Sequence, residues 1–215
     1  MKYDLVIFDM DGTILNTLDD LKDSLNVTFR HFGYPERTLS EVRSFVGNGI
    51  GKLIERAVPD GLSVKEKEDV LEYFTDYYGV HSQDKTRPYE GIVDAIRKIR
   101  AEGIKTAVVS NKIDFAVKDL VNKFFYGLFD YSLGECVGLN RKPHPDMVNK
   151  VLSELNIDKT SAVYIGDSEV DVMTASNSDL PIIAVSWGFR DKEFIRSKGA
   201  TEIVDRPEEL LNVLL

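Results

Sequence analysis

The chain has 215 residues, 43% hydrophobic and 29% charged, proportions typical of a soluble globular protein with one large domain or one domain carrying a smaller one. A net charge of -9 argues against nucleic acid and anionic membranes as partners, because both attract basic patches. The single cysteine, Cys136, excludes a disulfide within the chain and favours a cytoplasmic location. No apolar run approaches the roughly 20 residues that span a bilayer, so we expect neither export nor anchoring.

The first predicted element is a strand over residues 3–8, which ends at the run Asp9-Met10-Asp11-Gly12-Thr13. An unbroken apolar run predicts a buried parallel strand, and open α/β sheets bind ligands at the carboxyl ends of such strands. Two aspartates one residue apart can divide the work, with Asp9 as a nucleophile or metal ligand and Asp11 as a proton carrier. The alternative is a solvated Asp-x-Asp-Gly turn.

The next segment, residues 16–84, shows helical patterns and no strand signal. One helix is predicted behind a capping pattern at residues 17–20, and a second opens with the capping pattern at residues 63–66. We therefore expect a helical cap over 16–84, inserted into a core formed by 1–15 and 85–215. Within it, the aromatic stripe of residues 73–78 is interpreted as helix packing, and the charged run 65–69 as a solvated helix face.

From Arg87 onward, short apolar runs alternate with amphipathic helical patterns. Strands are predicted over residues 106–110, 161–165 and 181–185, with helices between them that close at Gly103 or open at Pro145. Such a β-α-β series predicts a doubly wound, mostly parallel sheet of the Rossmann-like α/β class, with helices on both faces.

Residues suited to phosphate chemistry follow two more predicted strands and also stand ahead of the predicted helix that opens at Pro145. Ser110 and Asn111 offer a hydroxyl and backbone amides for phosphoryl oxygens, and Lys142 offers a point cation. Asp167 and Asp171 supply the hard oxygen ligands that Mg²⁺ prefers. We expect these strand ends to meet in one crevice.

Each of these residues also has a purely structural interpretation. Ser168 with Asp171 three residues later fits a helix capping box, and Asp167 could stabilise the same helix N-terminus. Lys142 alone would more often lie on the surface. The joint order of the residues favours chemistry over coincidence.

In this order the residues resemble the motifs of the haloacid dehalogenase-like hydrolase superfamily, and the resemblance covers nearly the whole chain. The four motifs are, in turn, Asp9 to Thr13, Ser110, Lys142, and Asp167 with Asp171. The insertion after the first motif is similar to the family's first cap type. Residues 45–53, 87–91 and 187–190 are similar to segments of its phosphoglycolate phosphatases. One departure is Asn16, where many relatives carry an aspartate.

The resemblance implies a mechanism through an aspartyl phosphate. Asp9 attacks phosphorus, and Asp11 protonates the leaving alkoxide and then activates water. Mg²⁺ is held by Asp9, the backbone carbonyl of Asp11 and Asp167, with Asp171 orienting the metal's water or neighbours. Ser110, Lys142 and the backbone amides after Asp9 hold the transferring group, and Asn111 is expected among the substrate-binding residues. The cap loop Gly47-Asn48-Gly49 brings backbone amides to a small anionic leaving group; a tight turn between helices is the alternative.

The sequence therefore predicts a magnesium-dependent phosphatase, a phosphoric monoester hydrolase acting on a small phosphorylated metabolite, with 2-phosphoglycolate as the leading substrate. A sugar-phosphate mutase or pyrophosphatase could use the same core. A haloacid dehalogenase is disfavoured, because its reaction needs neither a second aspartate nor magnesium. A non-catalytic phosphate-binding regulator is the alternative from another class. We expect a cytoplasmic monomer or homodimer.

Overall fold

The computed structural model describes residues 2–215 and divides the chain into two compact units. The core unit comprises Met1–Leu15 and Pro88–Leu215, and the cap unit comprises Asn16–Arg87. The chain passes from one unit to the other through two short strands that pair with each other, β2 (Leu15–Asn16) and β3 (Arg87–Pro88). Among residues 2–215, no helix is long and apolar enough to cross a membrane.

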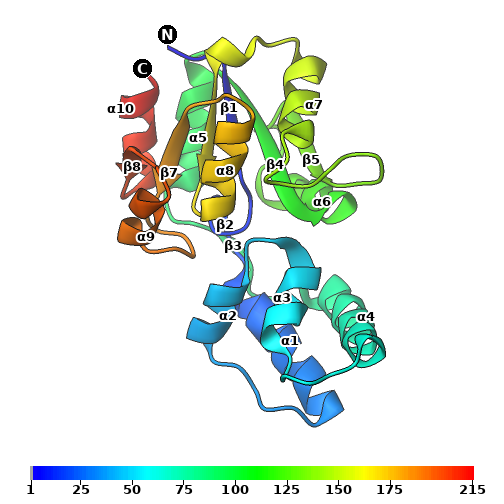
Figure 1. The fold of residues 1–215 in the computed structure, drawn as a ribbon. Helices are drawn as coiled ribbons and strands as arrows, with labels where there is room; N and C mark the ends of the chain where they lie inside the picture. The colour runs from blue at the N-terminus through cyan, green and yellow to red at the C-terminus, as the bar shows by residue number, and fades with distance from the viewer. Residues whose placement is uncertain (1) are drawn as a thin grey trace. The chain divides into compact units, whose positions relative to one another are not determined.

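The core unit is built on a six-stranded sheet with the order β5-β4-β1-β6-β7-β8 (Figure 1). Every neighbouring pair of strands is parallel, which confirms the predicted fold class. The strands are β1 (Leu5–Phe8), β4 (Lys105–Ile113), β5 (Tyr131–Glu135), β6 (Ala162–Gly166), β7 (Ile182–Val185) and β8 (Glu202–Val204).

Helices cover both faces of this sheet because successive residues of a strand point to opposite faces. Val6 and Phe8 of β1 pack in one apolar cluster with α5, α6 and α10, whereas Leu5 and Ile7 pack in another with α7 and α8. The core helices are α5 (Ile92–Ala101), α6 (Asp114–Phe124), α7 (Asp146–Leu155), α8 (Glu169–Asn177), α9 (Lys192–Ser197) and α10 (Leu210–Leu214), with 3-10 turns at Lys159–Ser161 and Pro207–Glu209.

All four strands predicted from apolar runs are confirmed, but two strands of the sheet were missed. The missed strands, β5 and β8, are the two edges of the sheet. Both are only partly buried, since β5 begins with two half-buried residues and β8 with an exposed one. An edge strand contacts one neighbour instead of two, so it needs no continuous apolar run.

The cap unit consists of four helices, of which the sequence predicted the first and the last. They are α1 (Leu18–Phe32), α2 (Leu39–Phe45), α3 (Gly49–Ala57) and α4 (Val64–His81). The capping box predicted at the start of α4 is present: the Ser63 hydroxyl accepts from the Glu66 amide at 3.3 Å, and the Ser63 amide donates to the Glu66 carboxylate at 2.8 Å.

The capping pattern expected at the start of α1 is wrong. Thr17 is the N-cap residue, but its side chain makes no capping hydrogen bond; instead the Leu18 amide donates to Oδ1 of Asn16 at 3.3 Å. The buried Asp20 carboxylate accepts from the backbone amides of Lys85 and Thr86 at 2.9 and 2.8 Å. Asp20 therefore joins α1 to residues 85–86 instead of capping the helix. Lys85 lies 65 residues away in the sequence, so the local spacing of residues could not reveal this contact.

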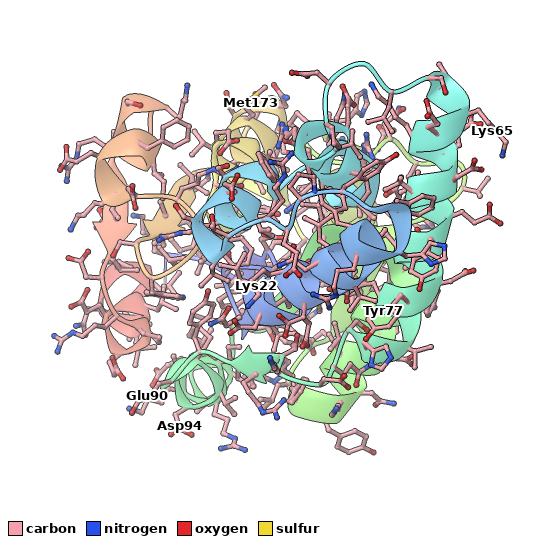
Figure 2. The ribbon with its side chains drawn as sticks, turned by 90° about the horizontal axis from the view of Figure 1, so that it is seen from below. Lys22, Lys65, Tyr77, Glu90, Asp94 and Met173 are labelled. Atoms are coloured by element: carbon pink, nitrogen blue, oxygen red, sulfur yellow. The ribbon has the colours of Figure 1, made fainter. Side chains whose placement is uncertain are left out.

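The aromatic stripe of α4 serves packing, as predicted. Phe74 and Tyr78 are buried and stack with ring centroids 5.4 Å apart, and Tyr73 stacks on His31 of α1 at 4.2 Å. Lys65, in the charged run of the same helix, projects to solvent (Figure 2) with 75% of its side chain exposed. α4 therefore has one face against α1 and one in water.

Candidate active site

Three adjacent strands at the centre of the core sheet, β4, β1 and β6, bring the predicted residues of the core unit together. Asp9 follows β1 and Asp167 follows β6, and the two strands are in register with Phe8 opposite Ile165. Ser110 lies in β4 just beyond Val108, which is opposite Phe8 on the other side. These side chains are buried, with at most 7% of any of the three residues exposed.

Lys142 lies at the centre of this site, although a lone lysine would more often face solvent. Only 3% of it is exposed, and its ammonium donates to Oδ1 of Asp9 at 2.7 Å, Oδ1 of Asp171 at 2.8 Å and the hydroxyl of Tyr164 at 3.0 Å. These bonds use all three donors of an ammonium. Burial lowers the pKa of Lys142, but Asp171 and Asp9 outweigh it and raise that pKa well above its usual value, so the lysine stays charged.

Asp171 links the lysine to the loop after β6. Its Oδ2 accepts from the Ser168 amide at 3.0 Å, the Ser168 hydroxyl at 2.6 Å and the Asp167 amide at 3.2 Å. The predicted capping box at the start of α8 is therefore present. The same carboxylate caps a helix with one oxygen and holds Lys142 with the other, so the structural and the chemical interpretation both apply.

Asp167 is oriented by two segments that lie far away in the sequence. The Thr13 hydroxyl donates to Oδ1 of Asp167 at 3.1 Å, and the Phe189 amide donates to Oδ2 at 2.7 Å. A Cβ at Gly188 would lie 2.3 Å from the Cβ of Asp167, so only glycine permits this close approach. Burial, followed by the charge of Asp171, raises the pKa of Asp167 from 3.8 to about 7.

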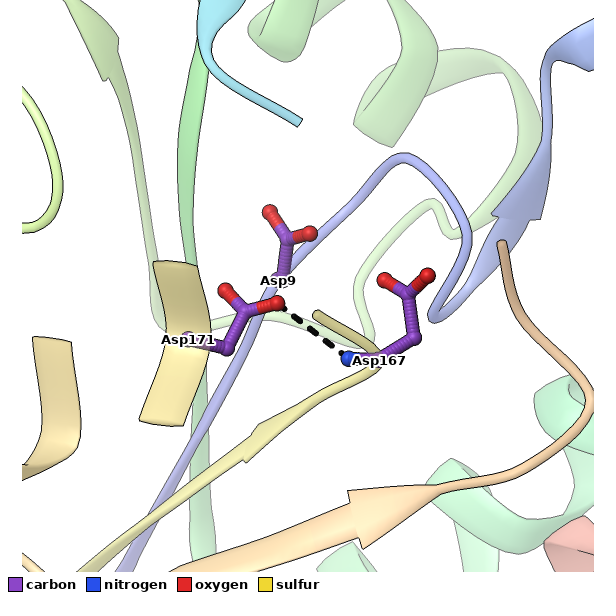
Figure 3. A group of neighbouring side chains, drawn as sticks. All are labelled: Asp9, Asp167 and Asp171. Carbon is purple, nitrogen blue, oxygen red and sulfur yellow. Dashed lines mark hydrogen bonds between the residues drawn. The ribbon is translucent and has the colours of Figure 1, made fainter. Parts of the chain in front are cut away.

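Asp9, Asp167 and Asp171, which we call the carboxylate cluster (Figure 3), each offer one oxygen, and these three oxygens lie within 4.8 Å of one another. Burial raises the pKa of Asp9 well above its usual value, and the charge of Asp171 adds to the effect. When all three carboxylates are ionised, the single ammonium of Lys142 leaves two negative charges without compensation, and this repulsion is part of what raises the pKa values of Asp9 and Asp167. Such a buried excess of two charges, on hard oxygen ligands, fits a divalent cation of the Mg²⁺ type.

Asp11 lies outside the carboxylate cluster and in a different environment. Its side chain is 23% exposed, and its Oδ1 lies 3.1 Å from the ammonium of Lys112, whose side chain is only 5% exposed. Asp11 is thus more exposed than the three carboxylates of the cluster, a difference in environment that fits different roles for Asp11 and Asp9.

Ser110 and Asn111 are placed by hydrogen bonds to their neighbours. The Ser110 hydroxyl accepts from the Lys112 amide at 3.2 Å, and the Asn111 side-chain amide donates to the backbone carbonyl of Lys142 at 3.1 Å. Oδ1 of Asn111 is buried and has no hydrogen-bond partner among residues 2–215. Asn111 thus fixes the backbone of Lys142, a role that the sequence did not suggest.

The loop Gly47-Asn48-Gly49 belongs to the cap unit, where it joins α2 to α3. Gly47 has φ 115°, a backbone conformation that favours glycine. Arg56 holds the loop, because it donates to Oδ1 of Asn48 at 2.7 Å and to the carbonyl of Phe45 at 2.8 Å. The loop is therefore ordered by its own unit, and its contact with substrate stays a prediction.

The sequence assigned no role to four residues of the site: Thr13, which lies in the first motif, Lys112, which follows Ser110 and Asn111, Phe189, which lies in the segment 187–190, and Tyr164. Tyr164 had a usable signal, because a hydroxyl inside an otherwise apolar strand needs a buried partner. Phe189 had none, since it contributes a backbone amide that any residue except proline carries.

The chain is similar to known proteins over nearly its whole length. The model of haloacid dehalogenase-like hydrolases matches residues 6–185. A phosphoglycolate phosphatase of Psychrobacter arcticus is 32% identical over 223 residues, which cover 100% of this chain and 97% of the relative. Phosphoglycolate phosphatase 1 of Pseudomonas aeruginosa is 29% identical, over 96% of this chain and 78% of the relative. A crystal structure of a candidate phosphoglycolate phosphatase from Lactobacillus delbrueckii subsp. bulgaricus superposes with a TM-score of 0.96 at 41% identity, covering 100% of this chain and 99% of that one.

Proposed function

Because the chain belongs to the haloacid dehalogenase-like hydrolase family, we propose that it is a magnesium-dependent phosphatase of a small phosphorylated metabolite, with 2-phosphoglycolate as the leading substrate. This membership confirms the family that the sequence motifs resemble and the expected enzyme class, a hydrolase. The relatives are named phosphoglycolate phosphatases, which are phosphoric monoester hydrolases. The observation that supports the proposal best is the contact of Lys142 with Asp9 at 2.7 Å inside the carboxylate cluster.

Asp9 is the proposed nucleophile. Phosphate monoesters react only when their oxygens are neutralised and the attacking and leaving groups are held in line. The ammonium of Lys142 fixes Oδ1 of Asp9, and the carboxylate attacks phosphorus to form an aspartyl phosphate. The raised pKa of Asp9 opposes this step because attack needs the ionised form. Positive charge at the cluster lowers that pKa again.

The cation is proposed to be Mg²⁺, held by Asp9, the Asp11 carbonyl and Asp167. When bound, it supplies charge that stabilises the phosphoryl oxygens. Thr13 and Phe189 keep Asp167 turned toward the cluster. Asp171, whose two oxygens bind Lys142 and the 167–168 amides, is proposed to act by holding these groups and the metal's surroundings in place.

Asp11 is the proposed acid and base. It protonates the leaving alkoxide, then removes a proton from the water that hydrolyses the aspartyl phosphate. Ser110 is proposed to donate its hydroxyl proton to a phosphoryl oxygen, since its oxygen already accepts from the Lys112 amide. Asn111 is proposed to add its backbone amide, and Lys142, whose three donors point at Asp9, Asp171 and Tyr164, is proposed to add its positive charge. The amides at Gly47, Asn48 and Gly49 are proposed to bind the remainder of the substrate.

The test is a screen of phosphorylated metabolites with the purified protein. We expect phosphate release with 2-phosphoglycolate as the best substrate, loss of activity in EDTA, and recovery with Mg²⁺ but poorly with Ca²⁺, whose looser coordination misplaces the phosphoryl group. Full activity in excess EDTA would remove the metal from the account. Isomerised sugar phosphate without phosphate release would identify the mutase alternative, and pyrophosphate as the best substrate the pyrophosphatase.

A protein that binds phosphate but releases none from any ester, including an aryl phosphate, would be the non-catalytic regulator. We further propose that the enzyme acts in the cytoplasm on a small-molecule phosphate ester, as a monomer or homodimer.

A further inference from the structure

The segment of residues 187–190, which comes shortly after β7, contacts two parts of the proposed metal site. The Phe189 amide donates to Oδ2 of Asp167 at 2.7 Å, in the loop after β6. The indole N–H of Trp187 donates to the backbone carbonyl of Thr13 at 3.0 Å, in the turn after β1. The segment therefore joins the turn after β1 to the loop after β6.

Thr13 links Trp187 to Asp167. Thr13 is fully buried, so its carbonyl needs a hydrogen-bond donor, and the indole of Trp187 supplies it. The hydroxyl of the same residue donates to Oδ1 of Asp167 at 3.1 Å. Because both groups belong to one residue, a shift of the Thr13 backbone away from Trp187 also moves the hydroxyl that orients Asp167.

The turn after β1 leaves little room for such a shift to be absorbed. The Leu15 amide donates to the Met10 carbonyl at 3.0 Å, and the Gly12 amide donates to the Leu15 carbonyl at 2.9 Å. A Cβ at Gly188 would lie 2.5 Å from the carbonyl oxygen of Gly12, and a Cβ at Gly12 would collide with Oδ2 of Asp167. The turn, the segment 187–190 and Asp167 are therefore packed so closely that a displacement of one is passed to the others.

We propose that Trp187 is a positioning residue for the divalent cation, and that its bond to Thr13 holds the Asp11 carbonyl and Asp167 in the geometry that Mg²⁺ demands. The inference rests on the proposed function, in which both of these groups bind the metal. Mg²⁺ needs a nearly ideal octahedron of ligands at about 2.0–2.1 Å, whereas Ca²⁺ accepts looser geometry at about 2.3–2.6 Å. A site that is held less rigidly should therefore lose more affinity for Mg²⁺ than for Ca²⁺.

The rival explanation is that Trp187 serves the stability of the fold alone. Its ring packs against the apolar cluster that contains Val6 and Phe8, and its centroid lies 6.5 Å from that of the Tyr89 ring. Trp187→Phe separates the two roles, because phenylalanine keeps an aromatic ring in this apolar contact but has no N–H donor. If the ring only stabilises the fold, the affinities for both cations stay unchanged in this variant.

The experiment measures the dissociation constants of Mg²⁺ and Ca²⁺ by isothermal titration calorimetry in the wild type, Trp187→Phe and Thr106→Val. Thr106 is the matched control, because its buried hydroxyl also donates to a backbone carbonyl, that of Leu128, but lies near the start of β4, whereas the site lies toward the carboxyl ends of the strands. We expect the dissociation constant of Mg²⁺ to rise about 10- to 100-fold in Trp187→Phe, as for other residues that orient metal ligands, and to keep its wild-type value in Thr106→Val. The dissociation constant of Ca²⁺ should rise less.

A folded Trp187→Phe protein that binds Mg²⁺ as tightly as the wild type would overturn the inference, and so would an equal loss of affinity for both cations. Either result, with Mg²⁺ bound by the wild type, would refute only the role of Trp187. A wild type that binds neither cation would instead refute the metal of the proposed function itself.

If Trp187→Phe does not fold, as judged by circular dichroism, the wild type still tests the inference, because Trp187 is the chain's single tryptophan. Its fluorescence should change as Mg²⁺ fills the site, with the midpoint that calorimetry gives. The change should be absent in Asp167→Asn, which lacks a proposed metal ligand. Fluorescence that does not respond while calorimetry records bound Mg²⁺ would overturn the inference.

Discussion

Replacing Asp167 by asparagine tests the electrostatics of the carboxylate cluster in the absence of metal. Burial and the charge of Asp171 raise the pKa of Asp167 from 3.8 to about 7. Between these two values the folded protein keeps a proton that the unfolded chain has lost. The free energy of unfolding therefore falls as the pH rises through this window, and the contribution present below pH 3.8 is lost once the pH passes about 7.

The size of the effect follows from the width of the window. From 3.8 to about 7 is roughly three pKa units, and each unit corresponds to about 1.4 kcal/mol, which gives on the order of 4 kcal/mol. Asparagine cannot ionise, so the free energy of unfolding of Asp167→Asn should not show this fall with rising pH. The difference in unfolding free energy between wild type and Asp167→Asn should then change by a few kcal/mol between about pH 4 and about pH 8, in the direction that favours the variant at high pH.

Urea unfolding followed by circular dichroism in EDTA measures this difference. Asp179→Asn is the matched control, because Asp179 is exposed and its pKa is lowered by Lys159, so its smaller effect should have the opposite sign. Mg²⁺ should stabilise the wild type more at high pH than at low pH, since the metal competes with protons for the carboxylates. Parallel pH curves for wild type and Asp167→Asn would refute the reasoning.

Three further predictions concern single side chains. Tyr164→Phe removes the hydroxyl that accepts from Lys142 at 3.0 Å, and should cost about 1–3 kcal/mol in urea unfolding and lower kcat more than it raises KM; an unchanged kcat would contradict a positioning role. Asp11→Asn should slow alkyl phosphates far more than aryl phosphates, which leave without protonation, and equal losses on both would make Asp11 structural. Arg56→Met releases Asn48 and Phe45 from their hydrogen bonds, and should reduce turnover of 2-phosphoglycolate while an aryl phosphate is still hydrolysed; unchanged turnover of both would leave the cap loop as a plain turn.

The sequence predicted the centre of the sheet and missed its edges. Strands that are buried on both faces need continuous apolar runs. β1, β4, β6 and β7 carry such runs and could therefore be predicted from the sequence. β5 contains a serine and a glycine, and β8 begins with an exposed glutamate, so neither carries that signal. Their pairing depends on a neighbouring strand that is far away in the sequence, as when β5 pairs with β4.

The site was predictable wherever a side chain at a strand end carries the chemistry. Asp9, Ser110 and Asp167 come together because the parallel strands β1, β4 and β6 end beside one another, and Lys142 reaches Asp9 from the segment between β5 and α7. Contacts made by backbone groups or by remote partners gave no local signal. The Phe189 amide on Asp167 is such a case, since it lies 22 residues away.

The most direct test of the central claim is to detect the phosphoryl group on Asp9. The enzyme is mixed with Mg²⁺ and 2-phosphoglycolate, quenched in acid within one turnover, digested and analysed by mass spectrometry. We expect one phosphoryl group on the peptide that contains Asp9 in the wild type, and none in a folded Asp9→Asn protein, which should also lack turnover. Near wild-type turnover by Asp9→Asn, or a phosphoryl group on another residue, would contradict the account.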